Sequence, residues 1–314
     1  MTQLSPAWRV AALAVVAAIC CIGFMTLNVR SDWDFTLAHR APRLAGMLLV
    51  ACAIGLSTVL FQTITHSRLL TPALMGFDVL YVLVHTMTAL LIGKQLGLQL
   101  GFAVEVGAMV ILAVGLFRLL FSGNVRSLHL LILLGILAGV LFRELAELAT
   151  RVLDPSEFAI QAGRNSASFG RINLGLLSIS AVIVLASAMA LFSLRRKLDV
   201  LGLGQGIAIN LGLNYKRLVF SLLALIALLV SVATALVGPT LFFGLLIANA
   251  SYWLLGSQQH RFTLPASALI GIICLVGGQV LLEHLLRATL PLAMVIELIG
   301  GLLFIALLMR GVKQ

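Results

Sequence analysis

Several ionisable side chains lie within long apolar stretches of the sequence, where a charged group is costly and often marks a functional site. Among them are Asp78, His85, Glu105, Glu283, His284 and Glu297. Asp78 and His85 are seven residues apart, a spacing that puts them on one face of a helix. A series of such groups could relay protons, which is the chemistry of a proton-coupled secondary transporter. We favour the simpler interpretation, in which each group pairs inside a helix bundle or near its edge.

Motifs for other chemistry are absent from the sequence. It contains no His-Glu-x-x-His pair for a hydrolytic zinc site and no Gly-x-x-x-x-Gly-Lys-Ser/Thr loop for nucleotide phosphates. Its cysteines, Cys20, Cys21, Cys52 and Cys274, lie in apolar runs without a Cys-x-x-Cys pair and are interpreted as small buried side chains. The sequence therefore predicts no catalytic residue, no metal site and no directly bound cofactor. An intramembrane enzyme would need a cluster of polar groups at one depth, which the sequence does not provide.

The composition excludes an ordinary soluble domain. Hydrophobic residues make up 61% of the chain and charged residues 10%, with a mean hydropathy of +1.13. Soluble domains carry roughly a quarter charged residues, so lipid must be the solvent for much of this chain. The net charge of +10 arises from Lys and Arg in short gaps between apolar runs. There they face lipid headgroups and set topology, so we expect membrane lipid and no nucleic acid as a partner.

The apolar runs predict an all-α integral membrane protein with about ten transmembrane helices in a single domain, residues 1–314. The predicted spans are 10–29, 44–65, 73–93, 98–121, 128–150, 174–194, 218–237, 240–255, 264–286 and 292–309. An even number places both termini on one side of the membrane. The basic cluster at both ends of 195–217 favours the cytoplasm for that side. This segment is predicted to form short helices at the membrane surface.

Several motifs occur in a fixed order along the chain. They are Arg40-Ala41-Pro42-Arg43, Gly55 with Gln62, Pro72 with Gly76, the stretch LGLGQGIAINLGL at 201–213, Gly238-Pro239 through Leu245, Gly256 with His260-Arg261 and Pro265, and Pro291 with Gly300 through Phe304. Together they resemble the FecCD-type permease subunits of ATP-driven importers for iron–siderophores, haem and cobalamin. The stretches THSRLLTPALMGFD and GRNSASFGRIN resemble a branch that serves catecholate siderophores. The resemblance implies a type II ABC importer permease fold.

The chain departs from the family pattern at two places. After the second span, most relatives have Arg-Asn-Pro-Leu-Ala where this chain has His66 to Leu70. In the penultimate span an Asp followed by an Arg is usual, whereas Gln279 and His284 lie near those positions here, with Arg287 displaced toward the end of the span.

The resemblance implies three groups of site residues. Arg40, Arg43 and Arg287 are expected to dock the acidic lobes of a periplasmic or lipid-anchored substrate-binding protein. The expected ATPase-coupling residues are Leu201, Gly202, Gly204, Gly206, Ala208, Leu211 and Gly212. The gate candidates at the cytoplasmic constriction are Ser67, Leu69, Ser127 and His129.

The resemblance also implies partners and a location. We expect a second permease subunit, with a slight preference for a homologous chain over a second copy, and two ATPase subunits that use the ATP. The protein is expected to be a multi-pass protein of the bacterial cytoplasmic membrane with both termini in the cytoplasm. Haem or cobalamin cargo, and a proton-coupled secondary transporter, remain the alternatives to an iron–siderophore importer.

Overall fold

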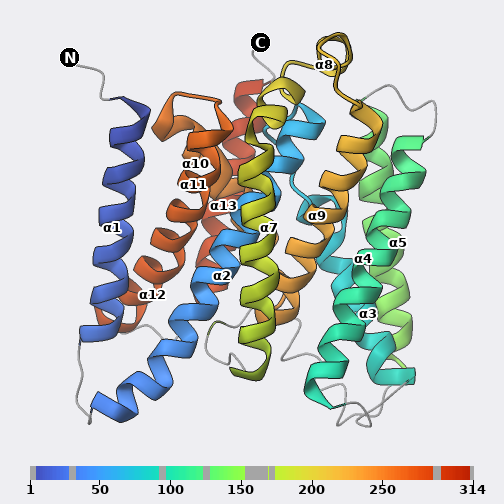
Figure 1. Ribbon diagram of the computed structural model, residues 1–314. Coiled ribbons are helices and arrows are strands. Elements are labelled where there is room, and N and C mark those ends of the chain that lie inside the picture. The colour runs from blue at the N-terminus through green and yellow to red at the C-terminus, as the bar shows by residue number, and fades with distance from the viewer. Residues whose placement is uncertain are drawn as a thin grey trace.

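The computed structural model describes residues 5–27, 33–91, 97–122, 128–152, 169, 174–285 and 291–311. These residues are helical, and no strand occurs among them. The main helices are α1 (Pro6–Thr26), α2 (Trp33–Thr65), α3 (Phe77–Leu91), α4 (Leu98–Ser122), α5 (Leu128–Thr150), α7 (Leu174–Leu201), α8 (Gln205–Asn210), α9 (Tyr215–Val237), α10 (Phe243–Leu255), α11 (His260–Ile272) and α13 (Leu292–Gly311) (Figure 1). The shorter elements are η1 (Ala73–Met75), η3 (Ile273–Gly277), α12 (Gly278–Val280) and η4 (Leu281–Leu285).

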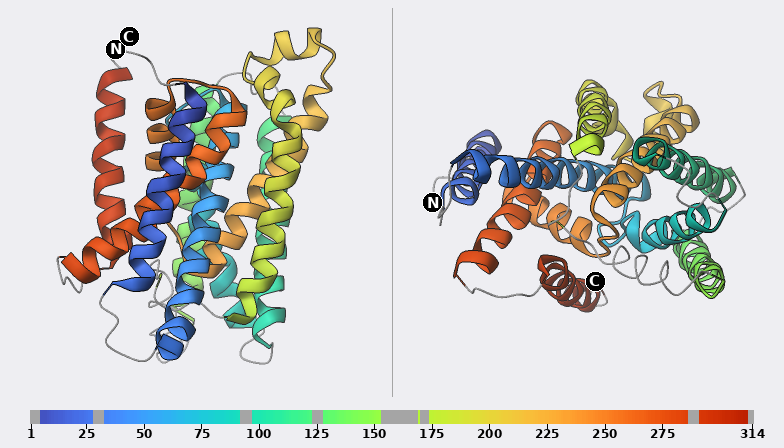
Figure 2. Two further views of the ribbon diagram at one scale, coloured as in Figure 1. Left: turned by 60° about the vertical axis from the view of Figure 1, so that its left-hand side comes forward. Right: turned by 90° about the horizontal axis from the view of Figure 1, so that it is seen from below.

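The long helices run between two ends of the molecule (Figures 1 and 2). The start of α1, the end of α13 and the short helix α8 lie at one end, which we call the α8 end. The start of α2 lies at the opposite end, which we call the far end. Helix α8 projects beyond the bundle on the connection between α7 and α9 (Figure 2).

The expected count of about ten spans is not confirmed. Within the described ranges, six helices are long and apolar enough to cross a membrane, namely Pro6–Thr26, Thr36–Thr65, Gln99–Leu116, Gly175–Leu201, Tyr215–Val237 and His260–Glu283. Helices α3 and α10 contain only 15 and 13 residues. At a rise of about 1.5 Å per residue, each spans only about 20 Å of a hydrocarbon core roughly 30 Å thick. They are buried partial crossings that depend on their neighbours.

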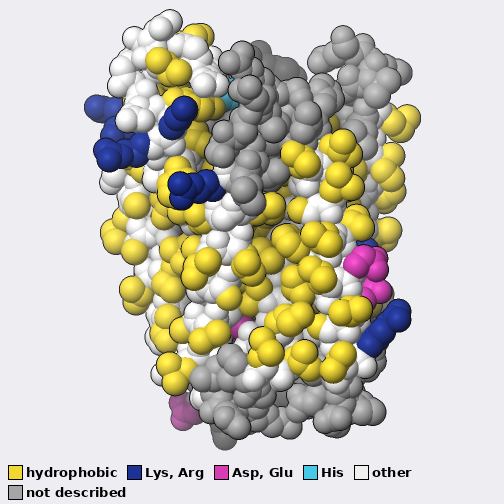
Figure 3. All heavy atoms as spheres, turned by 90° about the vertical axis from the view of Figure 1, so that its right-hand side faces the viewer, with side chains coloured by type: hydrophobic (Ala, Val, Ile, Leu, Met, Phe, Trp, Pro, Cys, Tyr) yellow, Lys and Arg dark blue, Asp and Glu magenta, His cyan; other side chains and the backbone are white. Residues whose placement is uncertain are grey.

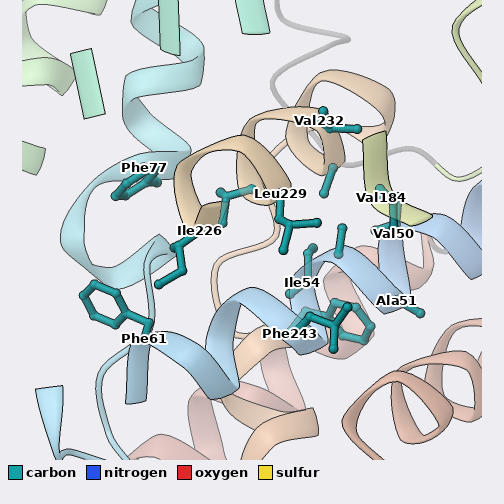
Figure 4. Close-up of a cluster of buried hydrophobic side chains, with 14 of the residues drawn as sticks. Val50, Ala51, Ile54, Phe61, Phe77, Val184, Ile226, Leu229, Val232 and Phe243 are labelled. Carbon is teal, nitrogen blue, oxygen red and sulfur yellow. The ribbon is translucent and has the colours of Figure 1, made fainter. Parts of the chain in front are cut away.

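The core forms where α2 crosses α9, and Figure 4 shows α2 residues Val50, Ile54 and Phe61 pointing into it. Phe77 of α3 and Phe243 of α10 begin the two short helices and are almost completely buried. The starts of the partial crossings are therefore anchored by aromatic side chains in the centre of the bundle.

Helices α2 and α11 approach each other closely because small residues face each other. A Cβ atom at Gly55 would lie 3.1 Å from the backbone of Ser267, and one at Gly271 would lie 3.1 Å from Ala51 Cβ. Small residues at such contacts let helix backbones come together in lipid, where van der Waals packing and hydrogen bonds drive association. The α2–α11 pair thus connects the far end to the α8 end through tightly packed helices.

The outer faces of the bundle are apolar. Figure 3 shows hydrophobic side chains across the middle of the face that carries α5, with charged side chains mainly toward its edges. Helix α5 exposes Leu133, Ile136, Leu137, Val140, Leu141 and Leu148. An apolar surface of this extent requires lipid or another apolar partner.

Candidate functional site

Two arginines predicted to dock a partner lie together near the start of α2 at the far end, and both are partly buried. Arg40 donates through Nη1 to the carbonyl oxygens of Phe24 at 2.9 Å and Leu27 at 2.8 Å. These carbonyls belong to the end of α1, where the last turn has no intrahelical donors for them. Arg40 therefore fixes the end of α1 against α2 as well as presenting a positive charge.

Arg43 forms an ion pair that the sequence did not reveal. Its Nη2 lies 2.7 Å from Oε1 of Glu283, and the two side chains are 26% and 34% exposed. The same oxygen accepts a hydrogen bond from Gln279 Nε2 at 2.7 Å, one helical turn away. The Arg43 guanidinium also lies over the ring of Phe24, 5.7 Å from its centroid. Arg287, the third predicted docking residue, lies outside the described residues, so its role stays a prediction.

The predicted ATPase-coupling residues form the surface turn that contains α8. Leu201 and Ala208 are fully buried and hold the segment on the bundle, whereas Leu211 is 60% exposed. Gly202, Gly206 and Gly212 are exposed. Gly204 has a φ of 104° at the start of α8, a left-handed conformation that glycine adopts without strain.

Three apolar side chains on the same segment were not predicted as site residues. Leu203, Ile207 and Ile209 are 57%, 50% and 51% exposed. Ile207 and Ile209 belong to α8 and Leu203 to the turn before it, and α8 itself stands clear of the bundle (Figure 1). Their presence could have been noticed from the sequence, because they alternate with the glycines and are flanked by basic residues at both ends.

Two of the gate candidates lie in the loop between α2 and η1. Ser67 Oγ accepts a hydrogen bond from Leu69 N at 3.4 Å, and both residues are partly buried. The carbonyl oxygen of Arg68 between them accepts from Gln62 Nε2 at 2.8 Å and from Asn249 Nδ2 at 3.0 Å. The loop is therefore held from α2 and from α10. Ser127 lies outside the described residues and the side chain of His129 is not described, so these two candidates stay predictions.

A further polar network lies at the α8 end, beneath the coupling segment. His260 Nδ1 and its backbone N both lie close to Asp199 Oδ1, at 2.7 and 2.8 Å. The other ring nitrogen of His260 lies 2.8 Å from Thr63 Oγ1. The network joins α7, α11 and α2, and it was not predicted from the sequence, where His260 was named as part of a family motif.

Two of the intramembrane ionisable groups pair directly with each other. His85 Nδ1 lies 2.7 Å from Glu105 Oε1, and Tyr81 stacks on the imidazole with ring centroids 5.6 Å apart. Asp78 is 5% exposed; it accepts a hydrogen bond from the backbone of Thr240, and its Oδ2 has no partner in the described part of the chain. His85 and Glu105 thus pair within the bundle, as the simpler interpretation expects. No group of three or more metal-ligating side chains occurs among the described residues.

Comparisons with known proteins place this arrangement in a family. Residues 9–310 match the FecCD transport family. The petrobactin import system permease YclO of Bacillus subtilis is 37% identical over 307 residues, which cover 96% of this chain and 98% of that protein. The petrobactin import system permease FatC of Bacillus anthracis is 31% identical over 276 residues, covering 87% and 78%.

A solved structure shares the fold. It is described as a metal-chelate type ABC transporter in an inward-facing conformation, and it superposes with a TM-score of 0.82 at 24% identity, covering 98% of this chain and 100% of that one. The sequence match spans both the partly buried arginines of the far end and the α8 segment. The chain therefore belongs to the FecCD transport family.

Proposed function

We propose that this chain is the membrane-spanning permease subunit of an ATP-driven importer, and that its cargo is an iron complex of a catecholate-type siderophore. The observation that carries the proposal is the match along almost the whole chain to the FecCD transport family, with petrobactin import permeases among its relatives. Because the family is one of transport proteins, the chain acts as a transport subunit and not as an enzyme.

The exposed surface of the α8 segment supports an ATPase as a partner. Leu203, Ile207 and Leu211 are each at least half exposed on α8 or the turns beside it, in a segment flanked by basic residues. Apolar side chains rimmed by charge are typical of a protein interface. We assign this surface to the ATPase subunits and the α8 end to the cytoplasm, which agrees with the basic cluster around Arg195 and Arg217.

The arginine pair at the far end supports docking of a substrate-binding protein from outside the cell. Arg40 and Arg43 are partly exposed beside the start of α2, where acidic groups of a partner can reach them. Such charges steer association and fix orientation more than they add affinity. A second permease subunit would complete the pore, and the exposed apolar faces of α5 and α13 offer the surfaces for it.

Transport in this scheme needs two packings of the helices and no covalent step in this chain. Binding-protein docking at the far end and ATP-driven closure at the α8 end bias the same equilibrium. ATP is used by the ATPase subunits, and the permease holds no cofactor of its own.

The test is radio-iron accumulation by iron-starved cells with and without this gene, using ferric petrobactin, ferric enterobactin and haem as separate probes. We expect loss of ferric catecholate uptake, with haem uptake unchanged, and restoration by the gene in trans. Intact catecholate uptake together with lost haem uptake would move the cargo to haem. Uptake that persists after ATP depletion would contradict the ATP-driven class.

A further inference from the structure

Asp199 lies at the root of the coupling segment and caps a different helix. It is two residues before the end of α7, and Gly202 to Gly204 follow before α8 begins. Its Oδ1 accepts from the backbone N–H of His260, the first residue of α11, at 2.8 Å. The N-cap residue Gln259 makes no side-chain cap within the described part of the chain. The start of α11 thus takes its cap from 61 residues upstream, and a carboxylate there also complements the helix dipole.

The His260 ring also contacts α2, so that it connects Asp199 to that helix. Its Nδ1 lies 2.7 Å from the Asp199 carboxylate, which can only accept, so Nδ1 must carry a proton. In the neutral ring Nε2 accepts from the Thr63 hydroxyl at 2.8 Å. In the protonated ring Nε2 donates to that oxygen, and the hydroxyl proton goes to the Val59 carbonyl oxygen, which is also 2.8 Å away. The ring is 6% exposed and Thr63 is buried, so a lost partner leaves an unsatisfied polar group that cannot easily reach water.

The last turn of α2 connects Thr63 to the loop that carries the gate candidates. Gln62, the preceding residue, donates to the carbonyl oxygen of Arg68 at 2.8 Å. The Arg68 guanidinium lies over the ring of Tyr252, 5.2 Å from its centroid, on α10. One carboxylate, one imidazole and one hydroxyl thus form a continuous path of contacts from α7 to the turn that holds this loop.

The small-residue contacts between α2 and α11 limit other ways of taking up a displacement of α7. Ser267 backbone atoms would lie 3.1 Å from a Cβ at Gly55, so the two helices are already in close backbone contact. Packed helices of this kind shift as units and do not deform continuously. Movement at the base of α11 is thus transmitted to the end of α2.

We propose that Asp199, His260 and Thr63 are positioning residues that couple movement of the α8 segment to the loop at residues 66–70. The proposal rests on the proposed function, because it needs an ATPase to move α8. These three residues belong neither to the predicted ATPase-coupling residues nor to the gate candidates. Their proposed role is to connect the two groups.

The test uses the complete transporter, purified with its ATPase subunits through a tag on this chain. The reporter is Ser67→Cys in a background in which Cys20, Cys21, Cys52 and Cys274 are replaced by alanine. The rate of labelling by a membrane-impermeant maleimide is measured without nucleotide and with ATP plus vanadate, alongside ATP hydrolysis. Thr63→Val removes only the hydroxyl from an isosteric side chain, and Thr63→Ser is its matched control.

We expect the reporter without further changes to alter its labelling rate at least about fivefold between the two states, the lower end of typical coupling. Thr63→Val should reduce that response to less than about twofold while ATP hydrolysis stays within about twofold, and Thr63→Ser should retain the response. His260→Asn, whose amide keeps the link to Asp199 but cannot reach Thr63, should behave like Thr63→Val. It also provides the test if the valine variant fails to assemble.

A normal labelling response in both Thr63→Val and His260→Asn would overturn the coupling role. A parallel fall of ATP hydrolysis and labelling response would overturn it too, because the network would then serve only ATPase association or folding. Failure of the proposed function is distinguishable, since the reporter transporter without these changes would then neither hydrolyse ATP nor respond to nucleotide.

Discussion

The span that begins with α11 and runs to Glu283 in η4 is held to α2 differently at its two ends. At the far end, Arg43 and Glu283 form an ion pair whose side chains are 26% and 34% exposed. At the α8 end, Thr63 and His260 are buried and joined by a hydrogen bond of 2.8 Å. Partly exposed ion pairs contribute about 0–1 kcal/mol, whereas leaving a buried polar group unsatisfied costs about 1–3 kcal/mol.

The Arg43–Glu283 contact can exchange its acidic partner, whereas the buried His260–Thr63 contact must persist. An acidic group of a docking partner can replace Glu283 on Arg43 at little cost, because water already reaches the pair. In the network of Asp199, His260 and Thr63, the Asp199 side chain is 38% exposed, but the contact between His260 and Thr63 is buried. The far end is thus suited to transient association, and the α8 end to permanent mechanical connection. The following variants test this contrast, in order of decreasing expected effect.

Reversing both far-end charges should have the largest effect. Arg40→Glu with Arg43→Glu converts attraction for an acidic partner into repulsion and places a second carboxylate beside Glu283, so uptake should fall at least about a hundredfold. Radio-iron uptake and the amount of inserted protein are measured together. Arg40→Lys with Arg43→Lys keeps both charges and should retain at least about a tenth of the uptake. Unchanged uptake in the glutamate variant would remove the docking role.

The close contact between α2 and α11, midway between the two ends, should show the next largest effect of a substitution. Gly55→Ala places a methyl group against the Ser267 backbone, which has no flexible side chain to yield, and should lower the free energy of unfolding by about 1–3 kcal/mol. The matched control is Gly107→Ala on α4, where a Cβ meets no described atom within 4 Å. Thermal unfolding in detergent should separate the two variants. Equal melting temperatures would show that the α2–α11 contact is not as close as described.

Removing the charge of Arg43 or of Glu283 alone distinguishes a docking role of this ion pair from a purely structural one. Arg43→Gln should weaken binding of the substrate-binding protein about tenfold, because a charge that faces an acidic partner is lost. Glu283→Gln releases Arg43 from its partner and should leave that binding equal or stronger. The measurement is affinity of the binding protein for the transporter in lipid nanodiscs. Equal weakening by both substitutions would mean that the pair serves only to hold α2 against the end of the penultimate span.

The smallest expected effect lies in the coupling segment. Gly204 has a φ of 104°, so Gly204→Ala should strain the start of α8 by about 1–2 kcal/mol and weaken ATPase association about fivefold or more. Gly107→Ala, on α4 outside the coupling segment and with no described atom within 4 Å of its Cβ, should leave association unchanged. Co-purification of the ATPase at graded salt concentrations measures both. An equal effect of Gly107→Ala and Gly204→Ala would indicate general destabilisation in place of strain at the start of α8.

Much of the fold could be predicted from the sequence, because membrane spans and surface helices have local signals. Of the short helices expected in 195–217 one is present as α8, whereas residues 195–201 and 215–217 belong to α7 and α9. Long apolar helices match six of the predicted spans. The count of about ten spans is not confirmed, because α3 and α10 are shorter than a full crossing; burial of Phe77 and Phe243 stabilises their starts. No local pattern distinguishes such a segment from a complete span.

The candidate sites were predictable only where a motif lies in one stretch of chain. Arg40 and Arg43 stand three residues apart, whereas Glu283, which pairs with Arg43, follows 240 residues later. Thr63 and His260 are separated by 197 residues. Such pairs depend on how the helices pack, and the π-helical turn of η4 that carries Glu283 leaves no clear sequence signal either.

The decisive experiment on ATP-driven import is cargo accumulation by the complete transporter reconstituted in liposomes, with ferric petrobactin and its binding protein outside and the ATPase side facing ATP. We predict accumulation that requires ATP and continues after a protonophore collapses the proton gradient. Accumulation driven by a proton gradient without ATP, and abolished by Glu105→Gln, would contradict this function and identify the His85–Glu105 pair as part of a proton-coupled transporter.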